Sequence, residues 1–158
     1  IMSKLVQNIV NTFIKDKFNF LRLLFFMAIG YLLYLIPLCR TTDSGDNVKF
    51  RPPPITFMIV WPMLYLMFGI SWIFTYIRYK KVWVDIIFAI VSTVITSWIV
   101  FYSCLSNKLA GVYVLLLSIC LLLLLINIVK IKSRLLLIPL LSWLLFALLM
   151  NTTEVQNL

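Results

Sequence analysis

The stretch "RPPPITFMIVWPMLYLMFGISW", Arg51–Trp72, begins with three adjacent prolines and continues as an apolar, aromatic segment. Proline has no backbone N–H, and it is tolerated in the first turn of a helix because that N–H would be unpaired there anyway. Each proline also pushes the residue before it toward extended geometry. We therefore expect Arg51–Pro53 to form a rigid extended strut and a helix to run from Ile55 onward.

Apolar residues are too abundant in this chain for a soluble domain of its length. Of its 158 residues, 63% are hydrophobic and 12% are charged, and the mean hydropathy is +1.07. A soluble domain of this size has no core large enough to hide so much apolar surface, whereas about 20 apolar residues cross roughly 30 Å of hydrocarbon. The predicted membrane spans are residues 18–39, 55–77, 82–105, 109–129 and 135–150.

Short connections join most of these spans, and they make consecutive helices antiparallel neighbours. The predicted fold is an all-α integral membrane protein, a compact bundle of five transmembrane helices over residues 18–151, followed by a tail over 152–158. The first apolar run, 18–39, is longer than the region of about 7–15 residues in a signal peptide, so we expect it to be retained. The loop 40–54 is the only connection long enough to cover one end of the bundle.

Residues 1–17 precede the first span. Leu5, Ile9 and Phe13 recur there at fourfold spacing among lysines, which suits an amphipathic helix at the membrane interface. A frayed terminus is the alternative.

The net charge of +9 is carried by basic residues at the ends of the apolar spans. Their position favours lipid headgroups, not nucleic acid, as partners. In a five-span topology, one side holds Lys4, Lys15, Lys17, Arg22, Arg78, Lys80, Lys81, Lys130, Lys132 and Arg134, and the other holds Arg40, Lys49, Arg51 and Lys108. This excess predicts a cytosolic N-terminus. Asp85, three residues into the third span, is expected to pair with Lys81.

Metal and cofactor chemistry has little support in the composition. The chain has no histidine, and Cys39, Cys104 and Cys120 lack metal-ligand spacing. The commonest haem ligand, catalytic base and zinc ligand are thereby missing. We expect no metal site and no resident cofactor, and we interpret Cys120, in mid-span, as a small packing residue.

Aromatic residues on the second and fifth spans suggest a ligand site. The two helical series are Trp61, Tyr65, Phe68 and Trp72 on the second span, and Pro139, Trp143, Ala147 and Asn151 on the fifth. Steps of three and four keep side chains on one face of a helix. A tryptophan on each of two helices can sandwich a flat apolar ligand. The alternative is that these aromatics only pack between helices or anchor at the interface.

Small and hydroxyl residues form a stripe on the third span. The stripe consists of Ala89, Ser92, Thr93, Thr96 and Ser97. Such residues let helices approach closely in lipid, so we favour helix packing over a polar wall facing a ligand. Ala89, Thr93 and Ser97 are the candidates for a homodimer face.

The two helical series resemble the signatures of the TspO/MBR family, the translocator proteins formerly called peripheral benzodiazepine receptors. Phe50, Pro52, Pro53, Phe57, Val60, Trp61, Leu64, Tyr65 and Gly69 match the second-helix signature, with Phe68 where methionine is usual. Leu135–Leu137, Pro139, Trp143, Phe146, Ala147 and Asn151 match the fifth-helix signature, with Leu140 in place of the usual tyrosine.

This resemblance implies a hydrophobic pocket near one end of the bundle, closed by the first loop. Family members bind porphyrins such as protoporphyrin IX, isoquinoline carboxamides and benzodiazepines, and some bind cholesterol. The implied ligand-binding residues are Trp61, Tyr65, Phe68, Trp143, Phe146, Ala147 and Asn151, and the implied residues of the lid and helix entry are Phe50, Arg51, Pro52 and Pro53. From their position in the chain alone, Arg51 or Lys49 is expected to meet a propionate at the mouth of the pocket; a structural role for these cations is the alternative.

Four functions follow as expectations. The first is a membrane receptor for tetrapyrroles and similar flat lipophilic ligands. The second is light- and oxygen-dependent porphyrin degradation, with Trp61 and Trp143 as candidate catalytic residues, because these positions match the tryptophans linked to it in bacterial members. The third is lipid or sterol translocation, although the C-terminal "NTTEVQNL" lacks the tyrosine and basic residue of the family's cholesterol segment. The fourth is a non-catalytic membrane scaffold. The expected location of this multi-pass protein is a bacterial envelope, or a mitochondrial or other organelle membrane of a eukaryote or its virus.

Overall fold

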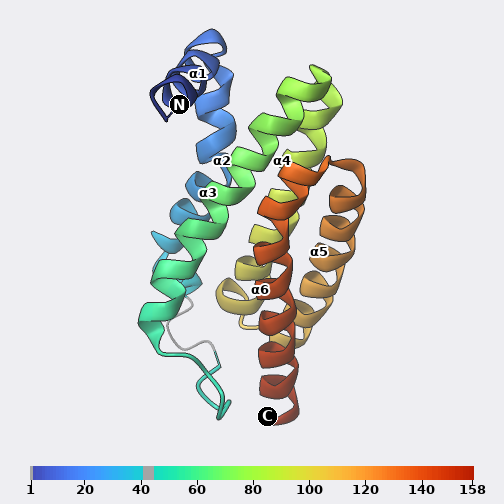
Figure 1. Ribbon diagram of the computed structural model, residues 1–158. Helices are drawn as coiled ribbons and strands as arrows, with labels where there is room; N and C mark the ends of the chain where they lie inside the picture. The colour runs from blue at the N-terminus through green and yellow to red at the C-terminus, as the bar shows by residue number, and fades with distance from the viewer. Residues whose placement is uncertain (1, 41–44) are drawn as a thin grey trace.

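The computed structural model describes residues 2–40 and 45–158, and every regular element in that part of the chain is helical (Figure 1). The α-helices are α1 (Met2–Lys15), α2 (Phe18–Tyr34), α3 (Pro54–Tyr79), α4 (Val82–Ile99), α5 (Lys108–Ile128) and α6 (Ile131–Gln156). A 3₁₀ turn, η1 (Pro37–Cys39), follows α2, and a π-helical turn, η2 (Val100–Cys104), follows α4. The predicted stripe of Leu5, Ile9 and Phe13 lies outside the described side chains, as does part of the predicted lid.

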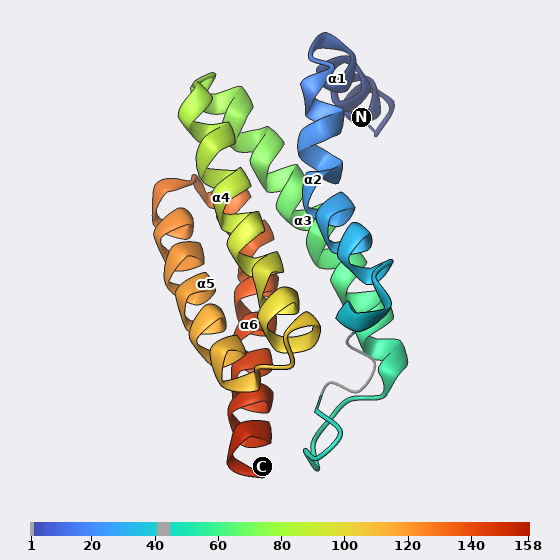
Figure 2. The ribbon, with the colours of Figure 1, turned by 180° about the vertical axis from the view of Figure 1, so that it is seen from behind.

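Five helices close into a ring in the order α2, α3, α6, α5, α4, and α3 also packs against α4 across it. Figures 1 and 2 show α1 and the α3–α4 and α5–α6 turns at one end, which we call the basic end. The described part of the first loop, the η2 turn and the C-terminus lie at the other, which we call the loop end. The predicted all-α five-helix bundle is confirmed.

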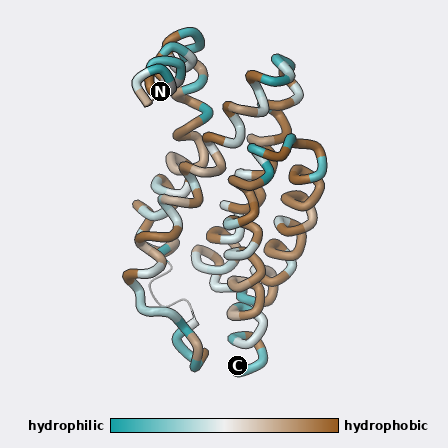
Figure 3. The backbone as a smooth tube through the Cα atoms, viewed as in Figure 1, coloured by the Kyte–Doolittle hydropathy of each residue, from teal (hydrophilic) through white to brown (hydrophobic). Residues whose placement is uncertain are grey.

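Hydrophobic residues predominate along most of the length of the helices in the ring (Figure 3), and many large apolar side chains are exposed. Large side chains such as Leu117, Leu124 and Leu145 are exposed by 52%, 60% and 50%. A soluble monomer rarely leaves so extended an apolar surface uncovered. Within the described residues, the helices long and apolar enough to cross a membrane are α3, α4 extended by η2, α5 and α6, and α2 is a shorter apolar helix of 17 residues.

Prolines set the start of α3 and the end of α2. Pro53 is extended, with φ −56° and ψ 146°, and α3 begins at Pro54, as the opening prolines predict. The first span was expected to continue to residue 39, but α2 ends at Tyr34 because Pro37 forces Ile36 into extended geometry, with φ −80° and ψ 116°. At the C-terminus, α6 runs on to Gln156, so most of the predicted tail is helical.

The first two helices of the ring approach each other closely at Gly69. A β-carbon there would lie 2.5 Å from the carbonyl oxygen of Leu23, so only glycine lets α3 come this near to the α2 backbone. Next to this contact, the Phe68 ring meets Phe26 at 5.0 Å and Phe88 at 5.3 Å, measured between ring centroids. This aromatic core joins α2, α3 and α4.

Asp85 pairs with Arg22 of α2, and the predicted pairing with Lys81 is wrong. Arg22 Nε and Nη2 donate to the two carboxylate oxygens at 2.6 and 2.9 Å, and Trp72 Nε1 donates to the same carboxylate at 2.7 Å. The Arg22 guanidinium is also within 3.5 Å of the Tyr76 ring centroid. Arg22 is only 5% exposed, so its charge requires a partner inside the bundle.

The hydroxyl groups of the stripe on α4 form hydrogen bonds within that helix. The buried Ser92 and Thr96 donate to carbonyl oxygens three or four residues earlier, at 2.7 to 3.0 Å, and so does the exposed Thr93. The hydroxyl donors of these three side chains are therefore engaged within α4 itself. Cys120 of α5 is exposed, so the expectation that it packs within the bundle is also wrong.

Candidate functional site

An aromatic cluster lies where α3 and α6 face each other toward the loop end. The Trp61 and Trp143 rings meet edge to face, with centroids 6.3 Å apart and an interplanar angle of 88°. Phe57 meets Trp143 at 5.6 Å, and Tyr65 lies 5.5 Å from Trp61. Phe146 extends the cluster along α6, 5.5 Å from Trp143. One aromatic series from each helix therefore converges on a single contact.

The cluster is half-buried, because Trp61, Tyr65, Trp143 and Phe146 all keep intermediate exposure. A flat ligand stacked between two indoles needs parallel rings about 7 Å apart, the sum of two van der Waals contacts of roughly 3.5 Å. Perpendicular rings at 6.3 Å leave no such gap. In this structure the two indoles contact each other, and a ligand that stacks on both requires one of them to turn.

Three residues that the sequence placed with this site lie outside the cluster. Phe68 is 0% exposed and Ala147 is 6% exposed, and both belong to the hydrophobic core. Asn151 accepts a hydrogen bond from Trp98 Nε1 at 3.2 Å and donates one to the carbonyl oxygen of Lys108 at 3.2 Å. Its amide therefore ties α6 to α4 and α5.

The first loop reaches the cluster through Phe50. This ring is 45% exposed and meets Phe146 edge to face at 6.3 Å. The next residue, Arg51, donates to the Asp46 carboxylate at 2.5 Å, whereas the Lys49 side chain is exposed. The aromatic cluster is therefore in contact with the loop through Phe146 and Phe50, and charged residues flank Phe50 in the chain.

A buried carboxylate anchors this loop to the bundle, and the sequence reasoning missed it. Glu154 of α6 is 1% exposed and accepts hydrogen bonds from the Tyr102 hydroxyl and the Lys108 ammonium group. The backbone N–H of Gly45 donates to the same carboxylate at 3.2 Å. Its three donors come from η2, from α5 and from the loop, so a single side chain holds three elements together.

A signal for Glu154 was present in the sequence. It lies three residues after Asn151 and continues the series of Trp143 and Ala147 along one face of a helix. The helix was expected to end before this position, so Glu154 fell within the predicted tail over 152–158. An acidic residue in register with an apolar face indicates a buried partner.

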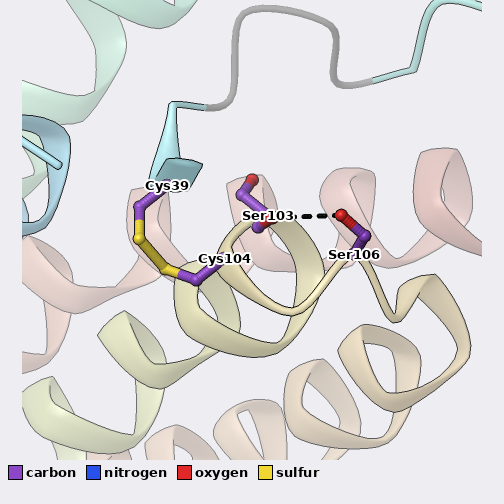
Figure 4. Close-up of a disulfide and its surroundings, with 4 residues drawn as sticks. All are labelled: Cys39, Ser103, Cys104 and Ser106. Atoms are coloured by element: carbon purple, nitrogen blue, oxygen red, sulfur yellow. Dashed lines mark hydrogen bonds between the residues drawn. A yellow bond between two sulfur atoms is a disulfide. The ribbon is translucent and has the colours of Figure 1, made fainter. Parts of the chain in front are cut away.

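A disulfide between Cys39 and Cys104 joins the end of η1 to the end of η2 (Figure 4). The two residues are separated by 65 positions in the chain. The bond lies at the loop end, where it fastens the start of the first loop to the α4–α5 connection. The first loop is thus held at one point by a covalent bond and at another by Glu154.

The lengths and apolar surfaces of the helices define an integral membrane protein built as a five-helix ring, with a half-buried aromatic cluster between α3 and α6. The profile of the TspO/MBR family matches residues 23–155, so the chain belongs to this family. Its members are integral membrane proteins that bind lipophilic small molecules, tetrapyrroles and sterols among them. A comparison with curated protein sequences finds no match.

Proposed function

We propose that this protein is a membrane receptor that binds a tetrapyrrole, such as protoporphyrin IX, or a similar flat lipophilic molecule on the aromatic cluster of α3 and α6. The observation that carries the proposal is the contact of Trp61 with Trp143, half-buried and flanked by further aromatic rings. Indole faces stack on flat apolar ligands, and the indole N–H offers one hydrogen bond. Family membership supports the same class of ligand.

Binding on this cluster requires a small rearrangement. One indole turns from its edge-to-face position so that a porphyrin face can lie against it, and the Phe50 ring moves with the loop. Rotation of an aromatic side chain at a half-buried position is a modest change, because such rings keep part of their surface outside the packed core. Lys49 is exposed and directly precedes Phe50 in the chain, and it is the proposed partner for a porphyrin propionate, since Arg51 is already engaged by Asp46.

The test is a titration of detergent-purified protein with protoporphyrin IX in the dark, followed by tryptophan fluorescence. We expect saturable quenching in the wild type and its loss in Trp61→Phe/Trp143→Phe. Trp83→Phe is the matched control, because Trp83 packs on Tyr79 at the basic end and should leave the affinity unchanged. The dimethyl ester of the porphyrin should bind Lys49→Gln and wild type equally, whereas the free acid should bind the variant more weakly.

Two results would contradict this proposal. Equal saturable quenching in the wild type and the tryptophan double variant would place the ligand elsewhere. Absence of saturable binding would favour the scaffold function. Illumination of the same samples tests the second candidate function, degradation, since the two indoles are close enough to act on one bound porphyrin. Light-dependent loss of the porphyrin spectrum that requires both tryptophans and oxygen would indicate an enzyme.

A further inference from the structure

A pocket lies at the basic end, away from the aromatic cluster. An open pocket of about 860 Å³ is found between the C-terminal end of α3 and the N-terminal turn of α6. Arg78, Lys130 and Lys132 contribute to its lining. All three side chains are exposed, and within residues 2–40 and 45–158 none of them forms an ion pair. The pocket therefore gathers three positive charges without a neutralising carboxylate.

The N-terminal turn of α6 adds to this positive potential. Lys130 is the N-cap residue, its side chain makes no capping hydrogen bond, and the first turn contains no acidic residue. The first backbone N–H groups of a helix have no partner within the helix and carry partial positive charge. Together with the side-chain cations, they favour an anionic group with several acceptor oxygens, such as a phosphate.

Buried hydroxyl groups hold the floor of the pocket in place. Thr75 of α3 donates to the hydroxyl of Ser133 at 3.2 Å, and Ser71 donates to the carbonyl oxygen of Ser133 at 3.0 Å. Thr75 and Ser133 are 2% and 3% exposed. These bonds fix the start of α6 against α3, so the pocket has a defined shape before any ligand enters.

The sides of the pocket are apolar, which indicates what kind of anion it accepts. Phe74, Ile77 and Ile131 line it and are exposed by 44%, 40% and 62%. A soluble phosphate makes no favourable contact with this apolar surface, whereas a phospholipid can pack its acyl chains against it. The cations lie at the ends of membrane-spanning helices, at the level of lipid headgroups.

We propose that this pocket binds the headgroup phosphate of an anionic phospholipid, with its acyl chains along Phe74 and Ile77 of α3. Basic pockets between transmembrane helices are suited to such headgroups. The site is separate from the proposed tetrapyrrole site, and it does not depend on what binds there. A bound lipid would bridge α3 and α6 at the end of the ring opposite the aromatic contact between the same two helices.

The proposal is tested by native mass spectrometry of the full chain in detergent, titrated with phosphatidylglycerol or with phosphatidylcholine of the same acyl chains. We expect the first phosphatidylglycerol to bind at least tenfold more tightly than phosphatidylcholine. Lys130→Gln/Lys132→Gln should lose about fivefold in affinity for each lysine removed. Arg78→Gln provides an independent variant on α3 and should lose a similar factor.

The matched control is Lys80→Gln/Lys81→Gln, which removes two charges at the same end without altering a residue that lines the pocket. It should stay within twofold of the wild type. Equal affinity for the two lipids in the wild type would overturn the proposal, and so would an equal loss in the control, because it would indicate general surface attraction. Displacement of the lipid by millimolar glycerol 3-phosphate would also overturn it, since the site would then recognise a soluble anion.

Discussion

Replacing Glu154 with glutamine is expected to destabilise the loop end of the bundle by about 3 kcal/mol. The variant keeps the size of the side chain and removes the charge that Lys108 faces. It also places an amide N–H₂ group among three donors: the Tyr102 hydroxyl, the Lys108 ammonium group and the Gly45 N–H. At least one buried donor is then left without an acceptor.

The magnitude follows from the burial of the two charges. Breaking a fully buried ion pair costs about 3–5 kcal/mol, because the remaining charge stays in a medium of low polarity. The side chain of Glu154 is 2% exposed, whereas that of Lys108 is 29% exposed. Water therefore screens part of the remaining positive charge, which puts the expected cost at the lower end of that range. For a chain of this size, about 3 kcal/mol lowers Tm by roughly 6–12 °C.

A double-mutant cycle in detergent provides the assay, with thermal unfolding followed by circular dichroism. Lys108→Met alone should also destabilise, since Glu154 would keep a buried charge. The double variant Lys108→Met/Glu154→Gln should cost about 1–2 kcal/mol less than the sum of the single variants, because neither unpaired charge remains. Additive single effects, or a cost of Glu154→Gln below about 0.5 kcal/mol, would refute the reasoning. Amide exchange should become faster at Gly45 in the variant and remain slow in α2.

Two further predictions concern the close contact of α2 with α3 and the disulfide. Gly69→Ala should lower the free energy of unfolding by about 1–3 kcal/mol, because its β-carbon would meet the Leu23 backbone. Gly30→Ala should lower it by less than about 1 kcal/mol, since the nearest atom there is the movable hydroxyl of Tyr65. Equal shifts of Tm in the two variants would contradict this prediction. Reduction of the Cys39–Cys104 disulfide should lower the free energy of unfolding by up to about 4 kcal/mol for a loop closed over 65 positions. Cys39→Ser/Cys104→Ser should no longer respond to reductant, and Cys120→Ser should respond as the wild type does.

Local sequence features determined the fold class of this protein, the turns that share one end and the start of α3. Hydropathy and span length predicted the five-helix membrane bundle, since a bilayer requires apolar segments of a given length. The distribution of cations predicted which turns share one end, and the figures place those turns together at the basic end. Helical periodicity predicted that Trp61 lies on one face of its helix with Tyr65, and Trp143 on one face of its helix with Ala147, because steps of three and four keep side chains on the same face. The prolines predicted where α3 begins.

Only the tertiary structure decided which distant groups meet. Asp85 has lysines nearby in the chain, yet it pairs with Arg22, 63 positions away, because ring closure brings α2 beside α4. Glu154 and the two cysteines find their partners in the same way, across turns whose paths local patterns do not specify. The edge-to-face arrangement of the two indoles depends on the separation of α3 and α6. Periodicity specifies the face of a helix on which a residue lies, whereas helix packing sets the distances and partners on which binding and stability depend.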